Sequence, residues 1–368
     1  MKKLFIVTGE LSGFNYAKEI VRKLKDKYKI TGIFLDEIEG TEILFNAKEI
    51  TAFGLFEAIT KLPAIKKGLK KIENYLKSEK PDAVLLIDFP GFNLKVAEIA
   101  KSQGIKVLYF ISPKFWAWNY KRGEKIVKLV DRMFVIFPFE VELYRKLGLE
   151  ATYVGNPLVD MVKPSKGETE FLNSVNLKKN PILLMPGSRP SEIRYLLNPL
   201  LLTAKEIKKR FPDTEFILPV AESLSFENIK NITQNIFNDV KLVKGKEAYN
   251  CMFYSQFGII ASGTASLEAA IAGLPHIVVY KLHPLTFAVA KRVVKLPFIS
   301  LPNIIAGEKI VEEILQKEVN PANLTEKFIT NFNQREKIKE KLKTKVKPKL
   351  KGNAIRNLCV EIEKELKI

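Results

Sequence analysis

Acidic and hydroxyl side chains follow apolar runs in the first half of the chain, where they could carry out acid–base chemistry. Glu10 and Ser12 follow the first apolar run, and Asp88 follows five apolar residues and precedes Phe-Pro. Both histidines, His276 and His283, lie in the second half. We therefore expect the general base of the first half to be a carboxylate. Asp88 is the candidate, because burial beside aromatic residues would raise its pKa toward neutrality. The alternative for Asp88 is a helix cap or turn residue.

Two apolar runs in the second half end in small, hydroxyl and basic residues that could hold phosphate. "LLMPGSRPSE" contains Gly187, Ser188 and Arg189, and "IIASGTASLEAAIAG" contains Ser262, Gly263 and Thr264. Free backbone N–H groups at a helix start favour phosphate, and arginine adds a bidentate donor. Glu268 lies one helical turn after Thr264, where its carboxylate could accept hydrogen bonds from ribose hydroxyls. Either motif alone is compatible with an ordinary helix cap, but the pair favours a nucleotide diphosphate.

Several common cofactor and metal motifs are absent from the sequence. Neither G-x-x-x-x-G-K-[ST] nor G-x-G-x-x-G occurs, so we expect neither a Walker loop nor a dinucleotide cofactor. No H-x-x-H, H-E-x-x-H or D-x-D cluster stands at these sites, and the two cysteines lack metal-ligand spacing. We therefore expect no metal ion.

The segment "ISPKFWAWNYKR", residues 111–122, contains both tryptophans of the chain, Trp116 and Trp118. It follows an apolar run and is therefore expected at a strand end, like Asp88. The two rings could form the wall of a substrate cleft, or they could only support the Asp88 loop. Stacking on nucleic acid is a third use, but the chain has no RNP, KH or helix-turn-helix signature.

Short runs rich in Val, Ile, Leu and Phe alternate with helical segments along the whole chain. Such runs without polar alternation are typical of parallel strands buried on both faces. Strands are predicted at 3–9, 30–35, 82–88, 106–112, 132–137, 152–155, 182–188, 215–221, 240–243, 257–262 and 276–280. Two successive arrays of this kind predict an α/β fold of two Rossmann-like doubly wound domains that face each other across a cleft. We expect domains at 1–160 and 161–345, and it stays open whether the helix at 353–368 rejoins the first domain.

The formal charge of +19 indicates a polyanionic partner such as nucleic acid, a phosphorylated substrate or an anionic lipid surface. Residues 61–80 carry seven lysines and two glutamates, with apolar residues at spacings of three and four. This pattern predicts a basic amphipathic helix, which could lie on an anionic membrane or pack on a sheet with a solvated lysine face. No run approaches the ~18 uncharged apolar residues that a membrane span needs, so we expect at most peripheral membrane contact.

Eight short blocks occur in one order between residue 9 and about residue 318 and cover most of the chain. They are "GELSG", "IDFPGFN", "SPKFWAWNYKR", "FPFE", "VGNPLVD", "PGSRPSE", "SGTASLEA" and "SLPNIIAGE". This combination resembles the lipid-A-disaccharide synthase family. The resemblance implies an inverting, metal-independent glycosyltransferase of the two-domain GT-B type without a cofactor. It also implies transfer from UDP-2,3-diacylglucosamine to 2,3-diacylglucosamine 1-phosphate, which releases UDP and forms a β-1,6-linked disaccharide.

The resemblance also implies roles for individual residues. Asp88 matches the family's essential acidic residue in the I-D-x-P motif and would be catalytic. A further set would bind the UDP donor, and all of its members except Asn303 belong to the two strand-end motifs. These residues are Ser188, Arg189, Ser262, Gly263, Thr264, Glu268 and Asn303. The residues expected on the acceptor side are Glu10, Ser12, Gly13, Asn93, Trp116 and Trp118.

Four positions depart from the family pattern. Phe14 and Gly91 stand where aspartates are usual, Asn119 stands where arginine is usual, and Asn156 replaces a histidine. These changes leave Asp88 as the only acid of its motif. They indicate a divergent member of the family, with a changed acyl-chain preference or acceptor as the alternative.

The implied substrates also bear on partners and location. Both are anionic amphiphiles, so we expect the helix at 61–80 to contact the anionic inner-membrane surface from the cytoplasmic side. A homodimer is compatible with the sequence, and we expect no nucleic-acid partner. The alternative functions are another UDP-GlcNAc enzyme of similar architecture, either a 2-epimerase or a peptidoglycan glycosyltransferase, and a non-enzymatic nucleic-acid-binding protein.

Overall fold

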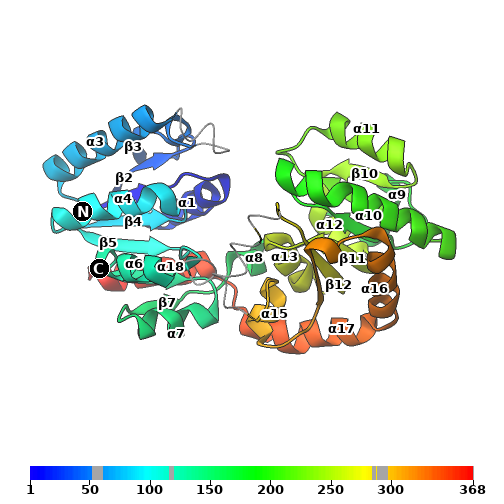
Figure 1. The fold of residues 1–368 in the computed structure, drawn as a ribbon. Coiled ribbons are helices and arrows are strands. Elements are labelled where there is room, and N and C mark those ends of the chain that lie inside the picture. The colour runs from blue at the N-terminus through cyan, green and yellow to red at the C-terminus, as the bar shows by residue number, and fades with distance from the viewer. Residues whose placement is uncertain (52–60, 116–119, 284–286, 288–296, 368) are drawn as a thin grey trace. The chain divides into compact units, whose positions relative to one another are not determined.

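A computed structural model describes residues 1–51, 61–115, 120–283, 287 and 297–367 (Figure 1). The chain forms two compact units, of which unit 1 comprises Met1–Pro157 and Lys351–Ile368. Unit 2 comprises Leu158–Leu350. Each unit contains one parallel sheet with helical crossovers, so the predicted pair of Rossmann-like doubly wound domains is confirmed.

Unit 1 is built on a seven-stranded sheet in the order β3-β2-β1-β4-β5-β6-β7, and every pairing is parallel. The strands are β1 (Lys2–Val7), β2 (Tyr28–Phe34), β3 (Thr41–Asn46), β4 (Ala83–Ile87), β5 (Lys106–Phe110), β6 (Arg132–Val135) and β7 (Ala151–Tyr153). The helices are α1 (Leu11–Leu24), α3 (Leu62–Glu79), α4 (Pro90–Ser102), α6 (Tyr120–Leu129), α7 (Pro138–Lys146) and the C-terminal α18 (Ala354–Leu366). A short turn of 3-10 helix covers Ala47–Glu49.

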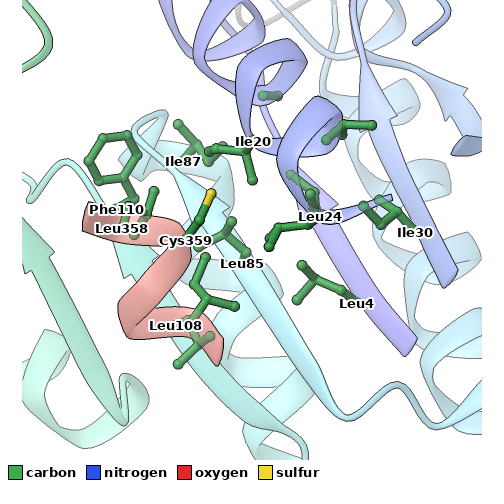
Figure 2. Packing of buried hydrophobic residues seen from close by; sticks show 14 of the residues in the cluster. Leu4, Ile20, Leu24, Ile30, Leu85, Ile87, Leu108, Phe110, Leu358 and Cys359 are labelled. Carbon is green, nitrogen blue, oxygen red and sulfur yellow. The ribbon is translucent and has the colours of Figure 1, made fainter. Parts of the chain in front are cut away.

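The core of unit 1 joins the two ends of the chain. Figure 2 shows Ile20 and Leu24 of α1 and Leu358 and Cys359 of α18 gathered around the strand residues Leu85, Ile87 and Leu108. All of these side chains are buried because central parallel strands present apolar residues to both faces. The C-terminal helix therefore completes the apolar layer that α1 begins. Ion pairs at 2.7 Å between Lys27 and Glu363 and between Lys106 and Glu365 flank this layer.

Unit 2 is built on a six-stranded parallel sheet in the order β10-β9-β8-β11-β12-β13. The strands are β8 (Ile182–Met185), β9 (Phe216–Val220), β10 (Lys241–Lys244), β11 (Phe257–Ala261), β12 (His276–Tyr280) and β13 (Glu312–Leu315). The helices are α8 (Pro157–Met161), α9 (Glu168–Ser174), α10 (Pro190–Arg210), α11 (Phe226–Ile236), α12 (Ala248–Tyr254), α13 (Thr264–Ala272), α15 (Leu301–Ala306), α16 (Pro321–Asn333) and α17 (Arg335–Lys341). Short turns at Gly245–Glu247, Gln316–Glu318, Leu342–Val346 and Lys347–Lys349 complete the unit.

His276 is the first residue of β12 and is fully buried. Its Nδ1 atom lies 2.8 Å from the carbonyl of Leu274, and burial lowers its pKa to about 4. The imidazole is therefore neutral at physiological pH and belongs to the core. No described helix is both long enough and apolar enough to span a bilayer.

Candidate active site

The first polar cluster lies at the switch point of the unit 1 sheet. The chain runs from β1 outward to β3 and then returns to β4 on the other side of β1, so the carboxyl ends of β1 and β4 are neighbours. Open α/β sheets bind ligands at such a switch point. Glu10 and Ser12, which follow β1, are exposed, and Asp88, which follows β4, is half-buried. Gly13 is buried, and a Cβ added there would lie 3.5 Å from the side chain of Ile87, the last residue of β4.

Asp88 has an unusually high pKa for a carboxyl group. The pKa rises from 3.8 to about 6, mainly because burial disfavours the charged form and secondly because Glu10 is negative. Lys114 and a hydrogen bond from the backbone of Phe89 oppose the rise. At pH 7 the carboxylate is therefore mostly ionised, yet basic enough to accept a proton from a reacting hydroxyl group.

Asn93 is fully buried beneath the Asp88 turn. Its Nδ2 atom donates to the carbonyl of Asp88 at 2.8 Å and to that of Ile87 at 3.2 Å. The amide therefore holds the backbone that carries Asp88. Gly91 is exposed, and a Cβ added there would meet no atom of the described residues within 4 Å, so the aspartate that the resemblance leads us to expect at this position would find room.

The segment that contains the two tryptophans, residues 111–122, is described except at residues 116–119. Trp116, Trp118 and the departure Asn119 lie outside the described residues, so their contact with substrate stays a prediction. The residues just before them are firmly held. The hydroxyls of Ser112 and Tyr144 lie 2.7 Å apart, and the Phe115 ring is buried against Tyr144.

The other two departures from the family pattern are buried parts of the unit 1 framework. Phe14 is 7% exposed and packs in the core cluster of α1. Asn156 is fully buried, donates from its backbone to the carbonyl of Lys351 at 2.7 Å, and donates from Nδ2 to that of Ile136 at 3.2 Å. Asn156 thus anchors the return of the chain to unit 1.

The second polar cluster lies at the switch point of the unit 2 sheet, where β8 and β11 are neighbours. Gly187, Ser188 and Arg189 follow β8 and lead into α10, while Ser262 and Gly263 follow β11 and lead into α13. The two motifs singled out in the sequence therefore lie on adjacent strand ends of one sheet. This is the place that the α/β architecture offers to a nucleotide.

The start of α10 is already occupied by a side chain of the same helix. The Glu192 Oε2 atom accepts hydrogen bonds from the backbone N–H of Ser188 at 2.8 Å and from that of Arg189 at 3.2 Å. Gly187 has φ +116°, and a Cβ there would lie 2.3 Å from this oxygen, so only glycine allows the approach. Sequence reasoning missed Glu192, although its position three residues after Arg189 is the spacing of a capping box.

The start of α13 is open by comparison. Gly263 precedes the helix. Among the described residues, no side-chain hydrogen bond caps the helix there, and a Cβ added at Gly263 would meet no atom within 4 Å. Thr264 is exposed and Ser262 is half-buried. The side chain of Arg189 is 78% exposed and lies 3.5 Å from Glu192, so its guanidinium has little else to hold it. Of the two helix starts, that of α13 is therefore the one that a side chain of its own helix leaves open, while Glu192 covers that of α10.

Glu268 and Asn303 differ in their availability to a ligand. Glu268 is half-buried, accepts a hydrogen bond from the Tyr249 hydroxyl at 3.2 Å, and has a pKa raised by burial. Asn303 is fully buried. Its Nδ2 donates to the Val311 carbonyl and to Glu313, and its Oδ1 accepts from the N–H groups of Ile310 and Val311, all at 2.7–2.9 Å. Asn303 therefore supports the loop that follows α15, and its side chain has no donor left for a nucleotide.

Within the described ranges, no group of three or more His, Cys, Asp or Glu side chains is placed to hold a metal ion. Among the described residues, the two switch points offer the Asp88 carboxylate, the exposed Arg189 guanidinium and the open start of α13.

Comparisons with known proteins agree with this arrangement. The family model described as lipid-A-disaccharide synthetase matches residues 4–363. A lipid-A-disaccharide synthase of Sulfurihydrogenibium sp. strain YO3AOP1 is 41% identical over 353 residues, covering 90% of each chain. Another from Persephonella marina is 39% identical and covers 88% of each chain.

A solved structure shares the fold at much lower identity. The UDP-GlcNAc 2-epimerase of Neisseria meningitidis, solved with UDP-GlcNAc bound, aligns over the full length of both chains with a TM-score of 0.68 and 16% identity. This likeness shows the fold alone, which is that of GT-B enzymes. The match to the family model and the two relatives show that the chain belongs to the lipid-A-disaccharide synthase family of GT-B glycosyltransferases.

Proposed function

We propose that the chain transfers 2,3-diacylglucosamine from its UDP derivative to the 6-hydroxyl of 2,3-diacylglucosamine 1-phosphate, with inversion at the anomeric carbon. The products are UDP and the β-1,6-linked disaccharide 1-phosphate. The observation that carries the proposal is the half-buried Asp88 at a sheet switch point, with a pKa of about 6. Family membership supplies the substrate class.

In this reaction Asp88 takes the proton of the acceptor 6-hydroxyl while the hydroxyl oxygen bonds to the anomeric carbon of the donor. The bond from that carbon to the diphosphate breaks on the opposite face, and UDP leaves with the electron pair. General base catalysis of this kind contributes about two to four orders of magnitude in rate. Glu10 raises the pKa of Asp88 through its negative charge, and Asn93 holds the backbone of the base.

The leaving diphosphate is assigned to the unit 2 switch point. Backbone N–H groups at the start of α13 and the exposed Arg189 guanidinium would stabilise its negative charge. Ser188, Ser262 and Thr264 line the same strand ends, and Glu268 would accept hydrogen bonds from the ribose. We assign Asn303 a supporting role instead of direct contact, since its amide is saturated.

The test is incubation of the full chain with the two diacylated substrates, followed by mass analysis for the disaccharide 1-phosphate. The proposal expects this product together with one UDP for each disaccharide. Turnover of water-soluble UDP-GlcNAc alone, without disaccharide, would instead identify a 2-epimerase. Tight RNA binding without UDP binding would identify a nucleic-acid-binding protein.

Helix α3 is the candidate membrane contact, and we propose that it places the protein on the cytoplasmic face of the inner membrane. Its buried residues Gly68, Ile72 and Leu76 face the protein. The remaining surface carries exposed lysines, among them Lys66, Lys67, Lys70 and Lys71. Anionic lipid would attract these charges by about 1 kcal/mol each.

Co-sedimentation with vesicles that contain anionic lipid tests this contact. Binding should weaken with salt and should be lost when the four lysines are changed to glutamate, because exposed charges are screened. The matched control makes the same change to glutamate at four exposed lysines of unit 2, which are Lys337, Lys339, Lys343 and Lys347. Equal loss in both variants would show that net charge, and not α3, determines binding.

A further inference from the structure

The turn that carries Asp88 adopts a backbone conformation that L-residues rarely take. Asp88 has φ +48° and Phe89 has φ +47°, so two consecutive residues with side chains lie in the left-handed region. The next residue is Pro90, which further restricts the backbone of Phe89. Such strain persists only where the surroundings over-determine it, and it concentrates at functional sites. The described neighbours of the turn therefore have to supply its restraints.

One restraint comes from β5, the strand next to β4. The hydroxyl of Tyr109 donates to the carbonyl of Asp88 at 2.6 Å, and the N–H of Asp88 donates to the carbonyl of Phe110 at 2.9 Å. Tyr109 is fully buried, and burial raises its pKa well above the usual value of 10. The hydroxyl thus keeps its proton and remains a donor at every pH at which the protein is folded.

A second restraint comes from Gly9, two residues after the end of β1. A Cβ added to Gly9 would lie 2.3–2.6 Å from three ring atoms of Phe89, so the ring rests directly on the glycine backbone. The Phe89 ring also packs on Phe92 of α4, with ring centroids 5.7 Å apart. The left-handed turn is therefore held at the Asp88 carbonyl by Tyr109 together with Asn93, and at the Phe89 ring by its contact with Gly9.

We propose that Tyr109 is a positioning residue for Asp88, which fixes the left-handed turn and with it the direction of the carboxylate. The inference rests on the proposed role of Asp88 as general base. Since the direction of a side chain follows the φ and ψ of its own residue, a relaxed turn would point the carboxylate elsewhere and admit water. Gly9 and Phe89 act with Tyr109, while Tyr109 itself touches no reacting atom.

Tyr109→Phe tests the proposal, because the ring stays and only the hydroxyl is lost. With the two diacylated substrates, we expect kcat to fall at least tenfold while both KM values and the affinity for UDP stay within twofold. The pH midpoint at which activity falls on the acid side should move to lower pH. Water that enters a relaxed turn removes part of the desolvation that raises the Asp88 pKa. A merely structural role would not move this pH midpoint.

Tyr28→Phe is the matched control. Tyr28 is also buried in the unit 1 sheet, but its hydroxyl has no hydrogen-bond partner among the described residues. Its kcat and pH profile should match those of the wild type. Gly9→Ala is a second, independent variant that displaces the Phe89 ring, and it should reproduce the lower kcat and the shifted pH midpoint.

The outcomes separate this inference from the proposed function. Asp88→Asn with near-normal turnover would remove the base role and with it the positioning role of Tyr109, while the transfer reaction itself would stand. Inactive Asp88→Asn beside a Tyr109→Phe variant with wild-type kcat and pH profile would overturn only the positioning role. If Tyr109→Phe does not fold, as judged by its thermal midpoint, Gly9→Ala decides: an unchanged kcat and pH midpoint there overturns the inference.

Discussion

At the residue scale, the catalytic role that we propose for Asp88 and the stability of the folded chain oppose each other. Its pKa is about 6 in the folded chain against 3.8 for a free side chain. As the pH rises from 3.8 to 6, the unfolded state releases its proton first, so the folded state loses stability over this window. Above pH 6 the full penalty applies, and it amounts to about 3 kcal/mol for two pKa units.

Asp88→Asn should therefore stabilise the protein at pH 7 while it abolishes turnover. We expect a higher midpoint of thermal unfolding and a fall in kcat by about two to four orders of magnitude, because the neutral amide is not desolvated at such cost and accepts no proton. At pH 4 the gain in stability should vanish. Calorimetry at pH 4 and pH 7 checks this, and a variant less stable than the wild type at pH 7 would contradict it.

Arg189→Ala should weaken UDP binding and turnover together. A charged hydrogen bond contributes about 1.5–3 kcal/mol, so the Kd for UDP should rise by roughly ten- to a hundredfold. Arg194→Ala is the matched control, since Arg194 is exposed on the same helix but away from the strand end. Isothermal titration with UDP measures both. Equal affinities for the two variants would place the diphosphate elsewhere.

At the element scale, the sequence predicted the interior strands and the edge strands β7 and β10, and it missed the two strands β3 and β13. The runs around β1, β4, β8 and β11 are buried along their length and were predicted to within a few residues. β3 and β13 are edge strands with Glu42, Glu312 and Glu313, so their apolar runs are short. Their pairing is decided by the neighbouring strand, which local composition does not reveal.

The same limit applies to the candidate site. Strand ends identified Asp88 and Arg189, because the chain order of βα units alone brings them to a switch point. Tyr109 gave no signal, since its contact with Asp88 exists only when β4 and β5 pair. Asn303 was predicted to contact the donor, yet its amide bonds to the carbonyl and N–H groups of the loop after α15. The spacing of residues in the sequence does not reveal these contacts.

Asn303→Ala should therefore act first on stability. Removing the amide leaves the N–H groups of Ile310 and Val311 and the Glu313 carboxylate without this partner, and each buried orphan costs about 1–3 kcal/mol. We expect a lower midpoint of thermal unfolding for unit 2, with UDP affinity nearly unchanged in the folded fraction. A stable variant with strongly reduced UDP affinity would restore Asn303 to the donor site.

At the scale of the whole molecule, the chain leaves unit 1 at Pro157 and returns to it at Lys351. The return is fixed where Asn156 and Tyr153 bond to Lys351 and where α18 packs on α1. The sequence left open where this helix docks, because the amphipathic pattern of a helix does not show which surface its apolar face covers.

Truncation after Leu350 should destabilise unit 1. The deletion exposes the partners of Leu358, Ile362 and Leu366, each of which stabilises the fold by about 1.5–3 kcal/mol when buried. The control Lys27→Ala/Lys106→Ala removes only two partly exposed ion pairs and should change the midpoint little. A truncated chain that unfolds at the wild-type temperature would show that α18 is dispensable.

The pH dependence of disaccharide formation tests the central claim most directly. With UDP-2,3-diacylglucosamine and 2,3-diacylglucosamine 1-phosphate as substrates, kcat/KM should fall on the acid side with a midpoint near pH 6, because protonated Asp88 cannot accept a proton. The residual activity of Asp88→Asn should lack this step. A wild-type profile that is flat from pH 5 to pH 8, or an Asp88→Asn variant that keeps the step near pH 6, would contradict the account.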